Sequence, residues 1–215
     1  MAKWIAGLTV LLAGIALPGA EIKVSSLHPR VFVRHNQAKL GKGVTVAEAR
    51  NRLRQPDYGR WRRPVTGRGP AAMLERAMRY LEEGDASDLN AVRDFLRSNT
   101  FSYERHDVSG FMAGAETAAA FDWIYAGLSG EDRSAILANL VTTTESSARF
   151  LRHGEPDVNH NYTYMALTTV AVCGLVLDGE PSPYGEKARE YLELAREFIE
   201  GPGMVLDTWN AREGA

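Results

Sequence analysis

The stretch YMALTTVAVCGLVL, residues 164–177, decides the fold, because it carries no charged side chain and is apolar all round when drawn as a helix. A helix that is apolar on every face must be buried on every face. Asp178-Gly179 ends the stretch with a turn-forming pair. Residues 164–177 are therefore predicted to form an inner helix that other elements cover on all sides.

Amphipathic segments lie before and after this inner helix along the chain. Each segment has apolar residues at helical spacing. Ser or Thr precedes the first turn of some of these segments, and Gly or Pro marks where others begin or end. No convincing strand pattern follows Val33, so the predicted class is all-α. The remaining predicted helices are 45–55, 70–83, 87–96, 111–126, 130–153 and 183–199.

Amphipathic helices around one wholly apolar helix indicate two layers, as in an (α/α) toroid or a helical solenoid. No internal repeat of fixed length is found, which favours the toroid. The predicted helices are too few to close a ring. Residues 204–210 follow a helix break and have the pattern expected at the start of a further element. We therefore expect residues 44–215 to be the N-terminal part of an incomplete (α/α) toroid from a longer protein.

Residues 1–20 have the pattern of a secretory signal peptide. Lys3 precedes the apolar run 4–16, and Leu17-Pro18-Gly19-Ala20 supplies a helix break and small residues for cleavage. The run is shorter than the about 20 residues that span a bilayer, although an uncleaved anchor is the alternative. We expect a secreted or periplasmic bacterial protein with no stable membrane insertion after cleavage, and an extended lead-in over residues 21–43.

Composition excludes several classes of protein. The chain has 215 residues, with 25 Lys and Arg against 27 Asp and Glu, a net charge of −2. This balance argues against nucleic-acid binding, and 45% hydrophobic residues with 24% charged ones are typical of a globular protein. Cys173 is the single cysteine, and no Cys/His spacing fits a zinc site. Neither a metal nor another cofactor is expected.

The polar run Asp157-Val158-Asn159-His160-Asn161-Tyr162 is the main candidate site. It lies at the start of the inner helix, where free N–H groups and the helix dipole favour an anion. Amide donors and an imidazole added there suit a carboxylate ligand. The alternative is that Asp157 or Asn159 only caps the helix and that His160 is a surface histidine.

A second candidate group lies in the predicted helix 111–126. Glu116, Asp122 and Trp123 combine acids with an aromatic ring, a pairing that can bind a sugar. The alternative is core packing around Trp123 with one buried hydrogen bond.

Four segments together resemble the heparinase II/III-like polysaccharide lyase family. They are HPRVF at 28–32, AAAFDWIY at 118–125, LSGEDR at 128–133 and NHNY at 159–162. The resemblance runs through most of the chain after residue 20, and it rests on the order and spacing of the segments. It implies an incomplete toroid that precedes a β-sandwich domain absent from this chain.

The resemblance also implies β-elimination on a uronate-containing polysaccharide, of the alginate or glycosaminoglycan type. Asn159 and His160 match the pair that binds the uronate carboxylate and assists proton transfer, with Asn161 and Tyr162 beside them. A shifted register would make Asn161 the carboxylate ligand instead. The family's catalytic tyrosine falls at or beyond Ala215, so the chain alone is expected to be inactive.

Two other functions stay open at this point. A glycoside hydrolase on the same toroid needs two carboxylates facing one cleft, with Glu116, Asp122 and Asp157 as candidates. A non-catalytic helical module that binds carbohydrate or protein needs no such pair.

Overall fold

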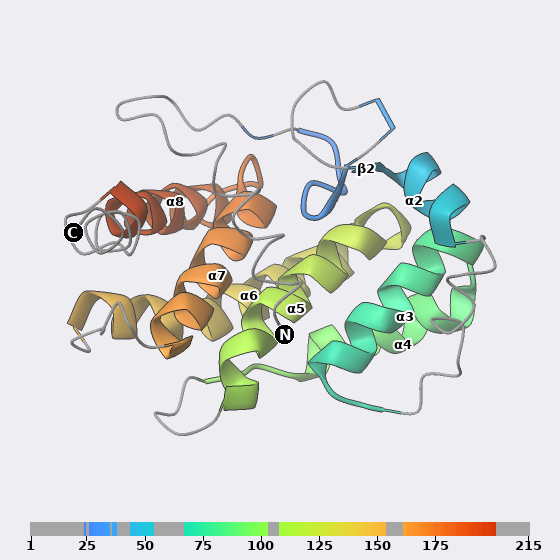
Figure 1. Ribbon diagram of the computed structural model, residues 1–215. Coiled ribbons are helices and arrows are strands. Elements are labelled where there is room, and N and C mark those ends of the chain that lie inside the picture. The colour runs from blue at the N-terminus through green and yellow to red at the C-terminus, as the bar shows by residue number, and fades with distance from the viewer. Residues whose placement is uncertain are drawn as a thin grey trace, which may run out of the picture.

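The computed structural model describes residues 24, 26–34, 36–37, 44–53, 67–102, 108–153 and 161–200, and helices dominate it (Figure 1). The all-α class is confirmed. The predicted signal 1–20 and the segments 154–160 and 201–215 lie outside the described residues. The elements are β1 (Val33–Arg34), β2 (Val44–Thr45), α2 (Val46–Leu53), α3 (Pro70–Glu83), α4 (Ala86–Ser98), α5 (Val108–Ile124), η2 (Tyr125–Gly127, a 3₁₀ turn), α6 (Gly130–His153), α7 (Asn161–Leu177) and α8 (Tyr184–Glu200).

Local capping explains where several helices begin and end. At α2 the Glu48 carboxylate accepts from the Thr45 amide at 2.6 Å, and the Glu48 amide donates to the Thr45 hydroxyl at 3.2 Å, a reciprocal capping box. At α6 the Asp132 amide donates to the Ser129 hydroxyl at 3.1 Å. Gly84 ends α3 in the left-handed conformation, with φ of 76°. These three boundaries agree with the sequence analysis.

Some details differ from the predictions. The helix α4 begins at Ala86, one residue before the predicted start at residue 87, because Asp85 caps it: the Asp85 carboxylate accepts from the Ser87 amide at 2.7 Å. The expectation of no strand after Val33 was wrong for Val44–Thr45, which pairs in parallel with Val33–Arg34. A pair of two-residue strands has no room for the alternating pattern by which strands are predicted from sequence.

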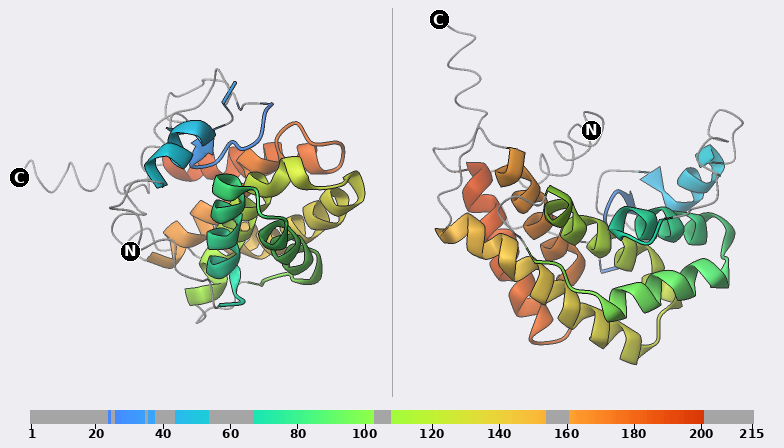
Figure 2. Two further views of the ribbon diagram at one scale, coloured as in Figure 1. Left: turned by 90° about the vertical axis from the view of Figure 1, so that its right-hand side faces the viewer. Right: turned by 90° about the horizontal axis from the view of Figure 1, so that it is seen from below.

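Three helices form an inner layer in the order α3, α5, α7, and the outer helices α4, α6 and α8 pack against them and against each other (Figures 1 and 2). The contacts show that α5 and α7 run in the same direction. Gly114 in α5 faces Thr169 in α7. Arg30 contacts the C-terminal ends of both helices: its amide donates to Asp122 of α5, and its guanidinium donates to the Asp178 carbonyl just after α7.

The outer helices also share one direction. The Tyr184 hydroxyl at the start of α8 donates to the Ser134 carbonyl early in α6, at 3.3 Å. Further along both helices, the Tyr191 hydroxyl donates to the Glu145 carboxylate at 3.0 Å. Helices thus alternate between the layers along the chain, and the outer helices return the chain to the end from which the next inner helix starts (Figure 1).

The prediction of a buried inner helix is confirmed in α7, where every residue from 166 to 174 is buried. Burial raises the pKa of the Cys173 thiol to about 12, so this side chain is neutral and serves as packing. None of the described helices combines the length and apolar character that crossing a membrane requires.

Gly114 sets the separation of α5 and α7. A Cβ atom at this position would lie 2.3 Å from Thr169 Cγ2. We expect Gly114→Ala to lower the free energy of unfolding by roughly 1–3 kcal/mol, since overpacking forces side chains or backbone to shift. Chemical denaturation monitored by circular dichroism measures this change.

Gly130→Ala is the matched control, because a Cβ atom at this position, the first of α6, meets nothing within 4 Å. Its unfolding free energy should equal or slightly exceed that of the wild type, as alanine favours a helix. Equal stabilities of the two variants would contradict the close approach at Gly114.

Candidate functional site

The start of α7 holds the described part of the predicted anion site. Asn161 is the first residue of this helix and is exposed, and Tyr162 is half-buried with its ring against the hydrophobic core. Asn159 and His160 lie outside the described residues. The structure therefore places an exposed amide side chain at the N-terminus of a buried helix, whose first N–H groups have no partner within the helix itself.

Tyr164 is a neighbouring group that the sequence analysis did not single out as functional. It lies three residues after Asn161 and so on the same side of α7. The side chain is partly exposed, and burial of the rest raises the pKa of its phenol. The phenol is thus neutral at pH 7 and can donate a hydrogen bond.

Glu116 lies in the inner helix α5 and is half-buried. Burial raises the pKa of its carboxyl group from 4.5 to about 7. A carboxyl group with such a pKa exchanges its proton near neutral pH, which is the property of a general acid or base. Along α5, Glu116 precedes Asp122 by six residues, or about 9 Å of helix.

Asp122 and Trp123 are bound to the segment 28–31 and are almost fully buried, at 1% and 7% exposure. One Asp122 oxygen lies 2.5 Å from His28 Nδ1, and the other accepts from the amides of Arg30 at 2.7 Å and Val31 at 2.8 Å. Trp123 Nε1 donates to the Val31 carbonyl at 2.9 Å. The polar atoms of both side chains are therefore engaged within the protein.

Two groups of predicted site residues consequently lie at opposite ends of the inner layer. Asp122 and Trp123 are near the C-terminus of α5, whereas Asn161 and Tyr162 are at the N-terminus of α7, which runs parallel to α5. The structure brings together the 28–32 and 118–125 segments. It does not bring Asp122 to the start of α7.

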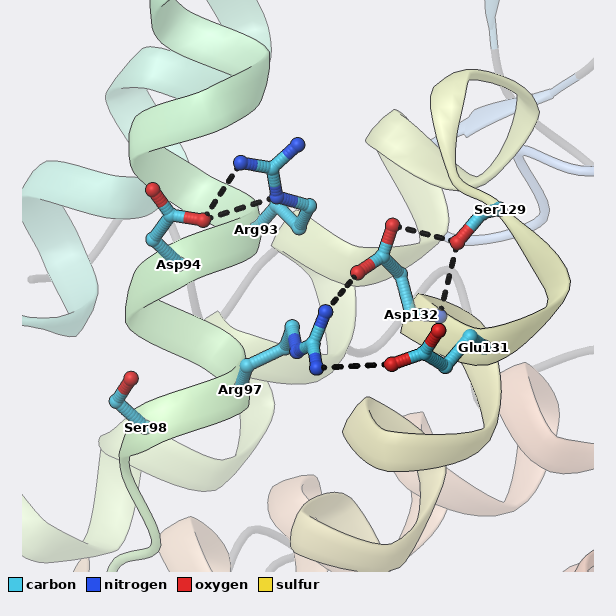
Figure 3. A pocket seen from close by; sticks show the side chains of 7 residues that line it. All are labelled: Arg93, Asp94, Arg97, Ser98, Ser129, Glu131 and Asp132. Carbon is cyan, nitrogen blue, oxygen red and sulfur yellow. Dashed lines mark hydrogen bonds and ion pairs between the residues drawn. The ribbon is translucent and has the colours of Figure 1, made fainter.

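A polar hollow of about 370 Å³ between α4 and the start of α6 was not predicted (Figure 3). Arg97 crosses it to Asp132 at 2.5 Å and to Glu131 at 3.4 Å, and Arg93 bonds to Asp94 at 2.7 Å. The charges in this hollow are paired with one another, as Figure 3 shows. Among the described residues, no group of three or more His, Cys, Asp or Glu is placed to hold a metal ion.

The raised pKa of Glu116 predicts a pH-dependent effect of Glu116→Gln on stability. Because the unfolded chain ionises near 4.5 and the folded chain near 7, wild-type stability falls as the pH rises between these values. The glutamine variant avoids this loss. The unfolding free energy of Glu116→Gln minus that of wild type should rise between pH 4.5 and pH 7 and level off above pH 7. We expect a total rise of about 2 kcal/mol, after allowance for the partial exposure of the side chain.

Denaturant titrations between about pH 4 and pH 8.5 measure this difference. Glu83→Gln, at an exposed position near the end of α3, is the matched control and should show no such rise. A flat difference for Glu116→Gln across the range would show that the folded carboxyl group titrates normally.

Comparisons with known proteins give no match: no protein-family model, no curated protein and no solved structure is similar to this chain. The features of the molecule that bear on function are the start of α7, the half-buried Glu116 and the docking of segment 28–31 on the end of α5.

Proposed function

We propose that this chain belongs to a secreted polysaccharide lyase that cleaves a uronate-containing polymer by β-elimination. The observation that carries the proposal is the place of Asn161, exposed at the first turn of the buried inner helix α7. Such a position offers an anion both a side-chain amide and the unpaired N–H groups of a helix start. The carboxylate of a uronate sugar is such an anion.

The fold proposed for the chain is an incomplete (α/α) toroid. Its support is the alternation of inner helices that run one way with outer helices that run the other way. Residues 28–32 and 118–125, two of the segments on which the family resemblance rests, also bind each other. Two resembling segments that lie far apart in sequence and contact each other support the resemblance more strongly than segments without mutual contact.

In the proposed reaction, Asn159 or Asn161 binds the C5 carboxylate of the uronate and withdraws charge from it. The C5 proton then becomes acidic enough to leave, and His160 assists its transfer. A tyrosine is proposed to abstract the C5 proton. The C4–O4 bond then breaks, a C4=C5 double bond forms, and an acid donates a proton to the leaving O4.

Glu116, Tyr162 and Tyr164 are proposed to bind the polymer through hydrogen bonds and ring contacts. A protonated Glu116 suits a polyanionic substrate better than an ionised one, because it adds no negative charge. Asp122 and Trp123, first predicted to bind substrate, are better placed to fix segment 28–31, since their polar atoms are already engaged.

A glycoside hydrolase is the second candidate, and the raised pKa of Glu116 is the observation that favours it. Hydrolysis needs a second carboxylate about 5–10 Å away across a cleft. Asp122 is a poor partner, because both of its oxygens accept hydrogen bonds from segment 28–31. The proposal of a lyase is therefore preferred, and a non-catalytic binding module is the remaining outcome.

The lyase proposal predicts unsaturated products from an anionic polysaccharide. The purified full-length protein should be incubated with alginate, heparan sulfate, chondroitin and hyaluronan while the ultraviolet absorbance of unsaturated uronate is followed. New reducing ends without this absorbance would favour the hydrolase. Binding without any cleavage would favour the non-catalytic module.

His160→Ala should lower kcat at least about 100-fold, the usual size of a lost proton-transfer group. His153→Ala is the matched control, because His153 is exposed in the last turn of α6, and it should keep near wild-type activity. Equal activity of both variants would move the site away from the start of α7.

A further inference from the structure

A buried histidine lies between two carboxylates where segment 28–31 meets the C-terminal ends of α5 and α7. His28 Nδ1 is 2.5 Å from Asp122 Oδ1, and His28 Nε2 is 3.4 Å from Glu180 Oε1. The three side chains are 5%, 0% and 8% exposed. We call these residues, together with Arg30, the His28 clasp.

The geometry of the clasp distinguishes the two charge states of the ring. A neutral imidazole that donates from Nδ1 to Asp122 presents the lone pair of Nε2 toward the Glu180 carboxylate. Two electron-rich groups then face each other in a site that water scarcely reaches. An imidazolium carries a proton on both nitrogens, so it satisfies Asp122 and attracts Glu180 at the same time.

The Tyr125 ring beside His28 also accommodates a positive charge on the imidazole. The His28 ring stacks on Tyr125 with centroids 3.7 Å apart and planes at 12°, a geometry in which an aromatic ring attracts a positive charge. Burial opposes ionisation of Glu180, but the neighbouring His28 and Tyr125 side chains outweigh it and lower the pKa of this carboxyl group. The titratable and charged groups around the ring are Asp122 of α5, Tyr125 of η2, Glu180 and Asp178 after α7, Arg30 of its own segment, and Arg133 of α6 over the Tyr125 ring.

The clasp connects the C-terminal ends of α5 and α7 through segment 28–31. The Arg30 guanidinium donates to the carbonyls of Leu175, Val176 and Asp178, at 3.3, 3.2 and 2.5 Å. These carbonyls at the end of α7 have no partner within their own helix. Release of segment 28–31 would therefore free the end of α7 as well as the Asp122 carboxylate.

We propose that the His28 clasp is a proton-dependent latch, closed when His28 is charged and loosened when it is neutral. The latch holds segment 28–31 on the ends of α5 and α7 while the ring is charged, and it opens locally when the ring loses its proton. This inference is independent of the proposed lyase function.

Hydrogen exchange of the Arg30 and Val31 amides reports on the latch, because both donate to Asp122. In the full 215-residue chain, we expect their protection factors to fall about tenfold between about pH 5.5 and about pH 8, the loss of one charge-assisted contact. In His28→Gln the protection factors should not change with pH. Glu180→Gln keeps the ring and its bond to Asp122, and it should reduce the pH dependence, because the carboxylate that faces Nε2 is removed.

His153→Gln is the matched control, since it removes an exposed histidine and leaves the clasp intact. It should retain the wild-type pH profile. A wild-type profile without pH dependence, or equal profiles for wild type and Glu180→Gln, would overturn the proposal. So would nitrogen chemical shifts that show a neutral His28 ring at about pH 5.5, and this measurement does not require either variant to fold.

Discussion

One buried carboxylate, Asp122, connects the N-terminal segment to the helical layers, and much of the arrangement depends on it. A charge without exposure to water is costly unless hydrogen bonds replace its hydration. Asp122 meets this requirement with donors from His28, Arg30 and Val31, which all come from one short segment. The segment therefore has one favourable position, and that position places Arg30 at the end of α7.

The two ends of the inner layer follow different physical rules. At the C-terminal end of α5 and α7, charged groups are buried, paired and closed to solvent. At the N-terminal end of α7, an amide side chain and two half-buried tyrosines remain accessible. Rigid support at one end and exposed polar groups at the other suit a scaffold that presents a binding site.

Sequence patterns predicted the helices well, because each has a capping signal or a break that acts over a few residues. Thr45 with Glu48 and Ser129 with Asp132 are examples whose hydrogen bonds the structure contains. Contacts between distant segments were not predictable in this way. Nothing in the local pattern around Asp122 shows that His28, 94 residues earlier, is its partner.

The candidate site was predictable from sequence only where it coincides with a helix start, as at Asn161. The pKa of Glu116 was not predictable, because the half-burial that raises it arises from tertiary packing.

The bonds from Arg30 to the end of α7 also bear on how the chain folds. Arg30 and Asp178 are 148 residues apart, so their contact closes a loop that spans most of the protein. Such a contact carries a large entropic cost and forms late unless the intervening helices have already assembled. During synthesis, segment 28–31 emerges before all of the described helices, yet it has no binding surface until α5 and α7 lie side by side. A part of this fold that is made early therefore takes its position late.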